Sequence, residues 1–313
     1  MIISASYKTD IPAFYAEWFM SRLRAGYCKV VNPYNHRQVT VVSLKREDVG
    51  GFVFWTRNVE PFLEVLDYLK SEGFPFVVQH SITGYPPELE HAVIPVEASV
   101  AHLREVRERY GPKVAIWRYD PIVVTSLTPV EFHRIRFGEL AQVLEGTTDE
   151  VVVSFAKIYD KTRRNISSAA FRAGFHWWEP DPDAKKALLE YFLPIAEGCG
   201  MRVSICAQPE NAIPGTHQAH CIDAARLTAV AGRLIVANIK GNRPGCMCHE
   251  AKDIGDYDTC PHGCVYCYAN TNKRLASRRH EEHDPKSEFL YPIRESKTLK
   301  SNAPTEMDLF EEV

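Results

Sequence analysis

Short apolar runs alternate with longer segments of helical periodicity along most of this chain. The runs are rich in β-branched and aromatic residues and predict strands at Ile2–Ser6, Gly51–Trp55, Phe76–His80, Val114–Trp117, Val151–Phe155 and Val203–Cys206, with Leu234–Asn238 as a further candidate. Helices are expected between them, at Pro12–Ala25, Val59–Glu72, Val96–Tyr110, Pro129–Leu144, Ala184–Glu197 and Asp223–Ala231. Such alternation favours parallel strands joined by helical crossovers. We therefore expect an α/β fold, a complete or partial TIM-like (β/α) barrel of six or seven βα units.

One segment departs from this alternation. Cys28–Leu44 alternates apolar and polar residues around the turn residues Asn32, Pro33, Asn35 and His36, which predicts a β-hairpin insertion. At 313 residues the chain is long enough for two domains, although α/β barrels of this length are often one. We expect a barrel-like domain over 1–240, a cysteine-rich segment over 241–280 packed on it, and a polar tail over 281–313.

Polar side chains gather at or just after the carboxyl ends of the expected strands. They are Trp55–Asn58, Gln79–Ser81, Arg118–Asp120, Lys157, Tyr159–Lys161 and Gln208. In α/β barrels this rim builds the active site. The alternative for each residue is a solvated loop position or a helix cap. As a set, they favour a rim lined with charged and hydrogen-bonding groups.

Cys260, Cys264 and Cys267 stand in the run Cys-Pro-His-Gly-Cys-Val-Tyr-Cys, a C-x3-C-x2-C spacing. Three thiolates this close in sequence can hold three corners of a cubane iron–sulfur cluster and leave its fourth iron without a protein ligand. A fully ligated electron-transfer cluster takes four cysteines, and structural zinc sites close with four ligands. The triplet therefore favours a cluster with an open iron. The alternative is a closed zinc or electron-transfer site shared with other cysteines.

The triplet, with the aromatic Tyr266 before its last cysteine, resembles the signature of the radical S-adenosylmethionine (SAM) superfamily. The wider pattern Cys-x-Cys … Asp-Ile-Gly-x-Tyr-x-Thr-Cys-Pro-His-Gly-Cys-Val-Tyr-Cys-Tyr-Ala resembles a bacterial family of unknown function, the DUF1848 proteins. The opening Ile-Ser-Ala-Ser-Tyr-Lys-Thr-Asp-Ile-Pro also fits that family, so the resemblance spans most of the chain.

This resemblance implies a [4Fe-4S] cluster held by the triplet, with SAM chelating the open iron. Reductive cleavage of SAM would yield a 5′-deoxyadenosyl radical that abstracts hydrogen from an unknown substrate, with an electron donor such as a flavodoxin or ferredoxin as partner. Tyr266 and Gly263 would contact the cofactor, Tyr266 beside the adenine. The residues left for catalysis and substrate binding lie on the rim. Arg57, Arg118 and Lys157 are candidates for an anionic substrate or the SAM carboxylate, and Asp10, Asp120, Tyr159 and Asp160 for hydrogen bonds or proton donation.

The position of the triplet departs from the superfamily pattern. In most radical SAM proteins the cysteines follow the first barrel strand, whereas here they follow the last one, and Tyr7–Asp10 after the first strand contains no thiol. A barrel's first and last strands are neighbours when it closes, so a loop from either can reach the same rim. No Gly-Gly-Glu run of the kind that often receives the SAM amine is present.

Four further cysteines, Cys206, Cys221, Cys246 and Cys248, lie in the same third of the chain. Four is the number that closes a zinc site or a second iron–sulfur cluster, and thiolates alone do not distinguish the two metals. Cys206 and Cys221 as buried small hydrophobes are the alternative. We expect structural roles for the isolated cysteines and solvent-facing turns for the flanking histidines; these residues are Cys28, Cys199, His249 and His262.

Charge gives little global attraction to nucleic acid, because the formal net charge is −3. Local signals point the other way: Lys161–Arg164 is a basic cluster, and residues 306–310, Glu-Met-Asp-Leu-Phe, look like a sliding-clamp docking peptide with Glu306 in place of the usual Gln. A nucleic-acid substrate is thus one candidate. A solvated helix start and an apolar pair that folds back are the alternatives.

No apolar run reaches the length of a membrane span, and the start lacks a signal peptide, so we expect no membrane partner. Nine cysteines without a secretion signal favour metal binding in a reducing cytoplasm over disulfides.

The competing function is a binding module stabilised by zinc or a closed cluster, without SAM chemistry. A simple electron-transfer protein is a third class. Neither role needs a large polar rim.

Overall fold

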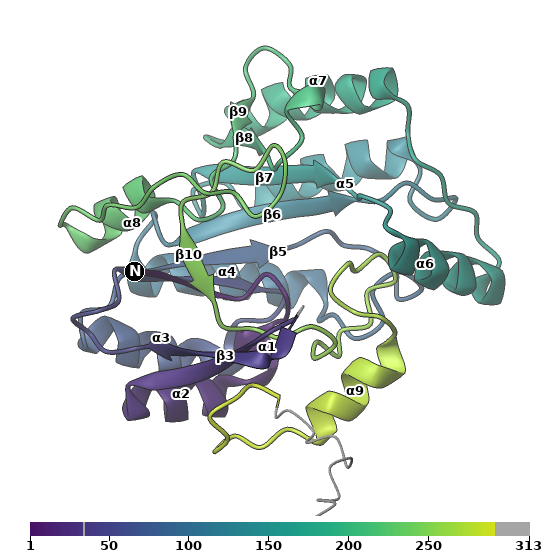
Figure 1. The fold of residues 1–313 in the computed structure, drawn as a ribbon. Helices are drawn as coiled ribbons and strands as arrows, with labels where there is room; N and C mark the ends of the chain where they lie inside the picture. The colour runs from purple at the N-terminus through teal and green to yellow at the C-terminus, as the bar shows by residue number, and fades with distance from the viewer. Residues whose placement is uncertain (34, 292–313) are drawn as a thin grey trace, which may run out of the picture.

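The computed structural model describes residues 1–33 and 35–291. Its central sheet has eight strands in the order β10-β1-β4-β5-β6-β7-β8-β9 (Figure 1). The strands are β1 (Ile2–Ala5), β4 (Gly51–Thr56), β5 (Phe76–Ser81), β6 (Ala115–Ile122), β7 (Glu150–Phe155), β8 (Arg202–Ile205), β9 (His217–Gln218) and β10 (Ala251–Asp253). All neighbouring pairs are parallel, as the α/β prediction requires. Between β9 and β10, however, the described residues form no ladder, so the sheet stays open along this seam.

The helices follow the strands in chain order. They are α1 (Ile11–Phe14), α2 (Ala16–Ala25), α3 (Leu63–Ser71), α4 (Val96–Tyr110), α5 (Val130–Val143), α6 (Asp160–Ala173), α7 (Pro182–Gly198), α8 (Ala224–Ala231) and α9 (Lys273–Glu281), with 3-10 turns at Glu60–Phe62 and Pro209–Asn211. All six predicted helical segments are present, the first divided into α1 and α2. The sequence did not predict α6, because most of its residues are polar and its periodic signal is weak. Its buried residues are only Thr162, Ile166, Ala169 and Ala170.

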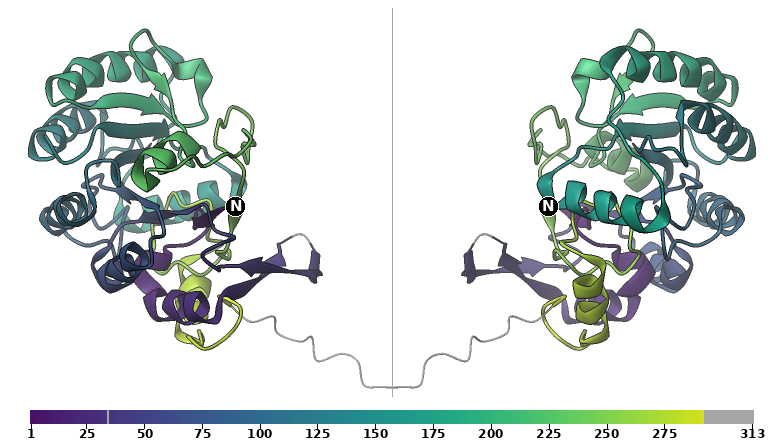
Figure 2. Two further views of the ribbon diagram at one scale, coloured as in Figure 1. Left: turned by 90° about the vertical axis from the view of Figure 1, so that its left-hand side faces the viewer. Right: turned by 90° about the vertical axis from the view of Figure 1, so that its right-hand side faces the viewer.

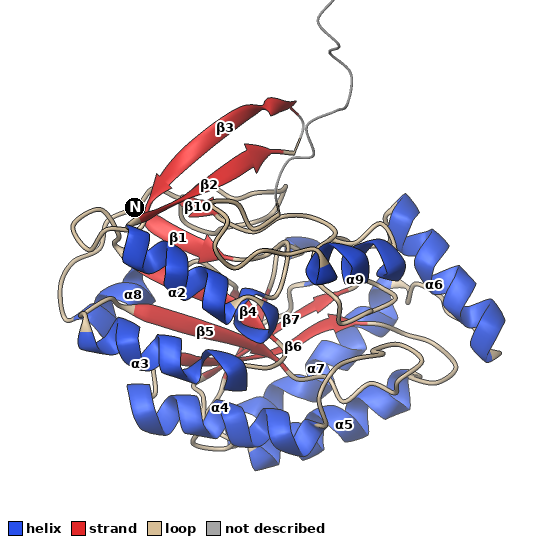
Figure 3. Cartoon of the chain, turned by 90° about the horizontal axis from the view of Figure 1, so that it is seen from below, coloured by secondary structure: helices blue, strands red, loops and turns tan. Residues whose placement is uncertain are grey.

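Strand alternation divides the sheet into two faces. In β4, Phe52 and Phe54 join the main core, which packs beneath the helices α2 to α5 and α7 on one face (Figure 3). Val53 points to the other face and forms a second core with residues of neighbouring strands and with Leu227 of α8. The same alternation continues through the carboxyl-terminal parts of β5 and β6 and into the residue just after β4. Arg57, Gln79 and Arg118 therefore lie on the α8 side of the sheet.

The predicted strand Leu234–Asn238 is wrong. This stretch has no ladder; Leu234 and Val236 are 76% and 80% exposed, and Ile235 between them packs into the second core without any strand pairing. The last strand is instead β10, which pairs with β1 in the register Ile2–Ala251 to Ser4–Asp253. Only three residues long, it is too short to give a periodic signal. The cysteine-rich segment thus contributes an edge strand as well as packing on the sheet.

The predicted hairpin is present as β2 (Tyr27–Asn32) and β3 (Asn35–Ser43), which project from the body of the molecule (Figure 2). Cys28 is buried at its base, and Cys199, which follows α7, is partly exposed. Part of the expected tail docks on this region, since Lys29 Nζ lies 2.7 Å from Glu288 and Trp18 donates to the Ser287 carbonyl at 3.0 Å. The clamp-like residues 306–310 lie outside the described residues. Among the helices that are described, none is long and apolar enough to cross a membrane.

Candidate functional site

The three cysteines of the triplet lie in the loop between β10 and α9, at the carboxyl end of β10. Because β10 is the parallel neighbour of β1, this loop reaches the same rim as the loop after β1. The triplet thus shares the rim with the first strand, as expected, but through the edge strand β10 and not through closure of a barrel.

Asp253 at the end of β10 fastens the two strands together. It accepts hydrogen bonds from Ser4 Oγ at 2.5 Å, from Ser6 Oγ at 2.8 Å and from the Tyr7 amide at 3.1 Å, and Lys8 Nζ lies 3.4 Å away. The sequence could have drawn attention to Asp253 only through its place in the Asp-Ile-Gly segment of the motif. Its partners are about 250 residues away in sequence, so no local pattern predicts these contacts.

His262, between the first two cysteines, is not a solvent-facing turn residue. It is only 3% exposed, its Nε2 lies 2.8 Å from Asp10 Oδ2, and its Nδ1 lies 3.1 Å from the carbonyl oxygen of Ala92. Each ring nitrogen thus faces an oxygen atom. Asp10 also accepts from the Arg57 amide at 2.8 Å and caps α1 through the Ala13 amide. Asp10 therefore holds the cysteine loop on the rim.

A buried ion pair supports the second half of the loop. Arg57 Nη1 lies 2.8 Å from Glu90 Oε1, and Arg57 Nη2 donates to the Tyr266 hydroxyl at 2.6 Å. The Tyr266 hydroxyl donates to Glu90 in turn, and burial raises the pKa of this phenol well above its ordinary value, so it remains a donor. Residue Glu90 also forms a β-bridge with Cys264. The pair therefore fixes both the backbone and the aromatic residue of the motif.

The three thiols lie on one loop and are each partly buried. Within the described chain no hydrogen bond joins any two of them, and no three His, Cys, Asp or Glu side chains are arranged as they stand to hold a metal ion. Burial raises the pKa of Cys264 to about 12, against the opposing charge of Arg57, and burial also raises the pKa values of Cys260 and Cys267. Buried thiols become thiolates when a metal compensates their charge. Three separated thiols on one loop fit the corners of a cluster better than the ligands of a single ion.

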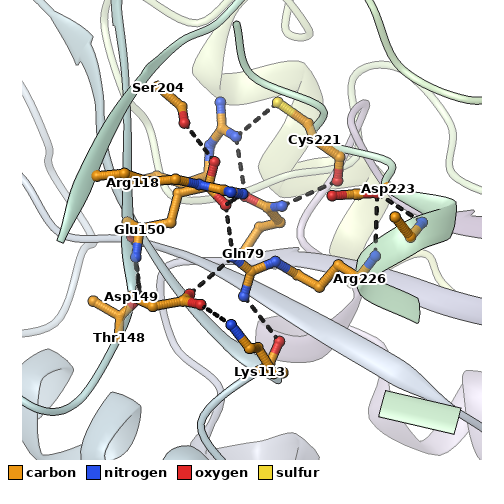
Figure 4. Close-up of polar contacts among 12 residues, drawn as sticks. Gln79, Lys113, Arg118, Thr148, Asp149, Glu150, Ser204, Cys221, Asp223 and Arg226 are labelled. Carbon is orange, nitrogen blue, oxygen red and sulfur yellow. Dashed lines mark hydrogen bonds and ion pairs between the residues drawn. The ribbon is translucent and has the colours of Figure 1, made fainter. Parts of the chain in front are cut away.

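A second polar group forms around Arg118, on the α8 side of the sheet (Figure 4). Arg118 binds Asp120 and donates to Gln79 Oε1 and to Cys221 Sγ, both at 3.1 Å. Nearer the amino ends of the strands, Arg226 of α8 lies 2.8 Å from Glu150. Although burial acts to raise the pKa of Glu150, hydrogen bonding to Arg202 and the charge of Arg226 hold it below its usual range. The predicted rim therefore divides, with Asp10 and Arg57 at the triplet and Arg118 and Asp120 at Cys221.

The remaining predicted residues follow β7. Lys157 is exposed, with its Nζ 5.6 Å from the centre of the Tyr159 ring, and Asp160 begins α6.

Gly263, in the cysteine loop, adopts a φ of 73°, which favours glycine, and a side chain there would approach Lys273 and His91. The structure thus gives Gly263 a backbone reason for its place in the motif.

A groove of about 720 Å³ runs beside the cysteine loop and the outer half of the hairpin. Its lining is rich in tyrosine and in cations, and includes Tyr7, Lys8, Tyr159, Lys161, Arg243, Lys252, Tyr257 and Tyr268. The sequence singled out Tyr159 and Lys161 but missed Arg243 and Tyr268, because these come to the groove from the cysteine-rich segment and not from a strand end. Tyr268 follows Cys267 directly, so the groove adjoins the triplet.

His80, at the end of β5 near Asp10, makes the stability of the folded protein depend on pH. It is fully buried, and burial lowers its pKa to about 3. In the unfolded chain this imidazole is protonated below about pH 6.5, whereas in the folded protein it stays neutral down to about pH 3. The free energy of unfolding therefore decreases as the pH falls from 6.5 toward 3. Between pH 7 and 5, wild type should lose about 2 kcal/mol more unfolding free energy than His80→Gln. Urea unfolding at both pH values measures this difference, and parallel pH profiles would contradict it.

Two comparisons bear on identity. No relative was found among proteins of curated function. A family model described as "Domain of unknown function (DUF1848)" matches residues 2–269, which include the sheet, the hairpin and all nine cysteines. The chain therefore belongs to the DUF1848 family.

Proposed function

We propose that this protein is a radical SAM-type enzyme whose [4Fe-4S] cluster is held by Cys260, Cys264 and Cys267. The observation that carries the proposal is that, within the described residues, no fourth cysteine or histidine joins the three thiols. The imidazole between the first two ligands in sequence, His262, is bound through both ring nitrogens to Asp10 and Ala92. The other six cysteines belong to the Cys221 group, the hairpin base and the end of α7. Three ligands leave one iron free to take SAM.

The cluster and SAM, when bound, supply a 5′-deoxyadenosyl radical for hydrogen abstraction. The chain's own residues position the loop and limit water. Asp10 and His262 anchor the stretch between the first two cysteines, and Arg57 with Glu90 anchors the stretch between the last two. Tyr266 remains our candidate adenine contact, with its ring packed at 6.0 Å from Tyr85. A loop held at both ends keeps its thiols in place for a cluster.

For the substrate, we infer an anionic ligand that enters the groove beside the triplet. Four cations, Lys8, Lys161, Arg243 and Lys252, share the groove with a single carboxylate, Asp253. Tyrosine faces beside cations suit bases joined by phosphates, so nucleic acid is the leading candidate class. Global net charge does not oppose this, because the attraction is local.

Spectroscopy of the anaerobic protein tests the enzyme proposal. Reconstituted with iron and sulfide, it should be brown, and its reduced cluster should change its electron paramagnetic resonance spectrum when SAM is added. A colourless protein with zinc at the triplet and no response to SAM would favour the alternative, a metal-stabilised binding module.

The groove proposal predicts weaker binding of single-stranded oligonucleotide by Lys161→Glu. Loss of one phosphate contact should lower the salt slope by about 1. Fluorescence anisotropy over a salt series measures both changes. Lys186→Glu on α7, outside the groove lining, is the matched control. Equal effects of the two variants would rule out the groove as the binding site and leave the cluster chemistry untouched.

A further inference from the structure

We propose that Cys206, Cys221, Cys246 and Cys248 bind one divalent ion of the zinc class, and that this ion clasps the open seam of the sheet. The proposal is independent of the chemistry at the triplet. It assigns a role to the four cysteines that the enzyme proposal does not use.

The four cysteines come from both sides of the seam between β9 and β10. Cys206 directly follows β8 and Cys221 follows β9, on one edge of the sheet. Cys246 and Cys248 precede β10, on the other edge. No ladder joins β9 to β10 in the described chain, although single hydrogen bonds cross here, among them the bond from the His249 amide to the Ile222 carbonyl at 2.9 Å and that from the Ile222 amide to Cys248 Sγ at 3.4 Å. An ion at this place would supply the connection that strand pairing supplies elsewhere.

The spacing of the sulfurs fits a single ion. Cys221 Sγ lies 3.5 Å from Cys206 Sγ, and the thiols of Cys221 and Cys248, and of Cys248 and Cys246, are close enough to shift each other's pKa. Around a tetrahedral zinc with bonds of about 2.3 Å, neighbouring sulfurs are about 3.8 Å apart. The ligands of a cubane must be much farther apart, since the whole cluster lies between them. The contact between Cys206 and Cys221 therefore favours two ligands on one metal atom over two corners of a cubane, and the sulfide content measured below separates zinc from a two-iron cluster.

The surroundings of the four sulfurs suit thiolates. Cys206, Cys221 and Cys248 are each 6% exposed. Two guanidinium groups donate to the sulfurs, Arg118 to Cys221 at 3.1 Å and Arg243 to Cys206 at 3.4 Å. These bonds stabilise negative sulfur in a place with little water.

One adjustment is needed, because the sulfur contacts run as a chain and do not yet surround one point. Cys246 is the least buried of the four and follows Gly245, which has a φ of 75°. Its side chain lies on a turn outside the strands, so rotation of that side chain can close the site without disturbing the sheet.

The test uses the full chain with Cys260, Cys264 and Cys267 all replaced by alanine, so that the triplet cannot contribute metal. This protein should contain one zinc per chain by plasma mass spectrometry and no acid-labile sulfide. Adding Cys206→Ser or Cys248→Ser should remove the zinc, and Cys199→Ser at the end of α7 should keep it. If the serine variants do not fold, cobalt added to the zinc-free parent should give the visible spectrum of a tetrahedral thiolate site.

Several results would overturn the proposal. Iron with sulfide in the triplet-free protein would mean a second cluster, and a metal-free protein, or a Cys206–Cys221 disulfide found by mass spectrometry, would mean no ion site. The clasp is tested by hydrogen exchange. Removing zinc should speed exchange in residues 217–222 and 246–253 more than in β5, and unchanged exchange there would contradict the clasp even with zinc bound.

Discussion

Cys264→Ala is expected to abolish reductive cleavage of SAM and to release the iron of the triplet. Cys264 is the middle ligand of the three, and its backbone is paired with Glu90 at the rim. Loss of groups that only orient ligands costs about 10–100-fold in metal affinity or activity, so loss of a ligand itself should exceed that range. Iron and sulfide content, with 5′-deoxyadenosine measured by chromatography, checks both effects.

Two matched controls separate this effect from general damage to the protein. Cys199→Ala removes a thiol at the end of α7 and should leave iron and SAM cleavage unchanged. Cys246→Ala should lower only the metal bound by the other four cysteines. Full SAM cleavage by Cys264→Ala would mean that the triplet has been wrongly assigned.

Arg57→Met is expected to cause the largest loss of stability. It leaves Glu90, which is 5% exposed, as a buried carboxylate without its cation, and it removes the donor to the Tyr266 hydroxyl. Breaking a buried pair by removing one partner costs about 3–5 kcal/mol. Urea unfolding measures the loss, and the iron content of the reconstituted protein should fall with it, because the pair seats the cysteine loop.

The double variant Arg57→Met/Glu90→Leu provides the decisive comparison. With both charges replaced by apolar groups, most of the lost stability should return, since no unpaired charge remains. Arg109→Met, which removes an exposed pair with Asp67, should have little effect. If the double variant is as unstable as Arg57→Met, the cost comes from packing and not from the charge.

The sequence predicted the parts of the fold that carry a periodic signal. The long parallel strands and α4 are where the alternation placed them, and the hairpin follows its turn residues. β10 could not be found, because a strand of three residues with a lysine at its centre has no period. The open seam between β9 and β10 depends on the position of β10, so the sequence did not predict it either.

The site was predictable in its residue types and less so in its contacts. Spacing alone identified Cys260, Cys264 and Cys267, but the partner of His262 lies 252 residues away, and no local pattern reveals that pairing. We expected the polar residues at the strand ends to form a single group. The fold separates Asp10 and Arg57 from Arg118 and Asp120, because they belong to strands at different distances from β10.

Reductive cleavage of SAM tests the central proposal most directly. Wild-type protein, reconstituted anaerobically and reduced with dithionite, is predicted to release 5′-deoxyadenosine and methionine from SAM, while the protein with Cys260, Cys264 and Cys267 replaced by alanine releases none. A fully loaded, reduced wild-type protein that forms no 5′-deoxyadenosine would contradict the account.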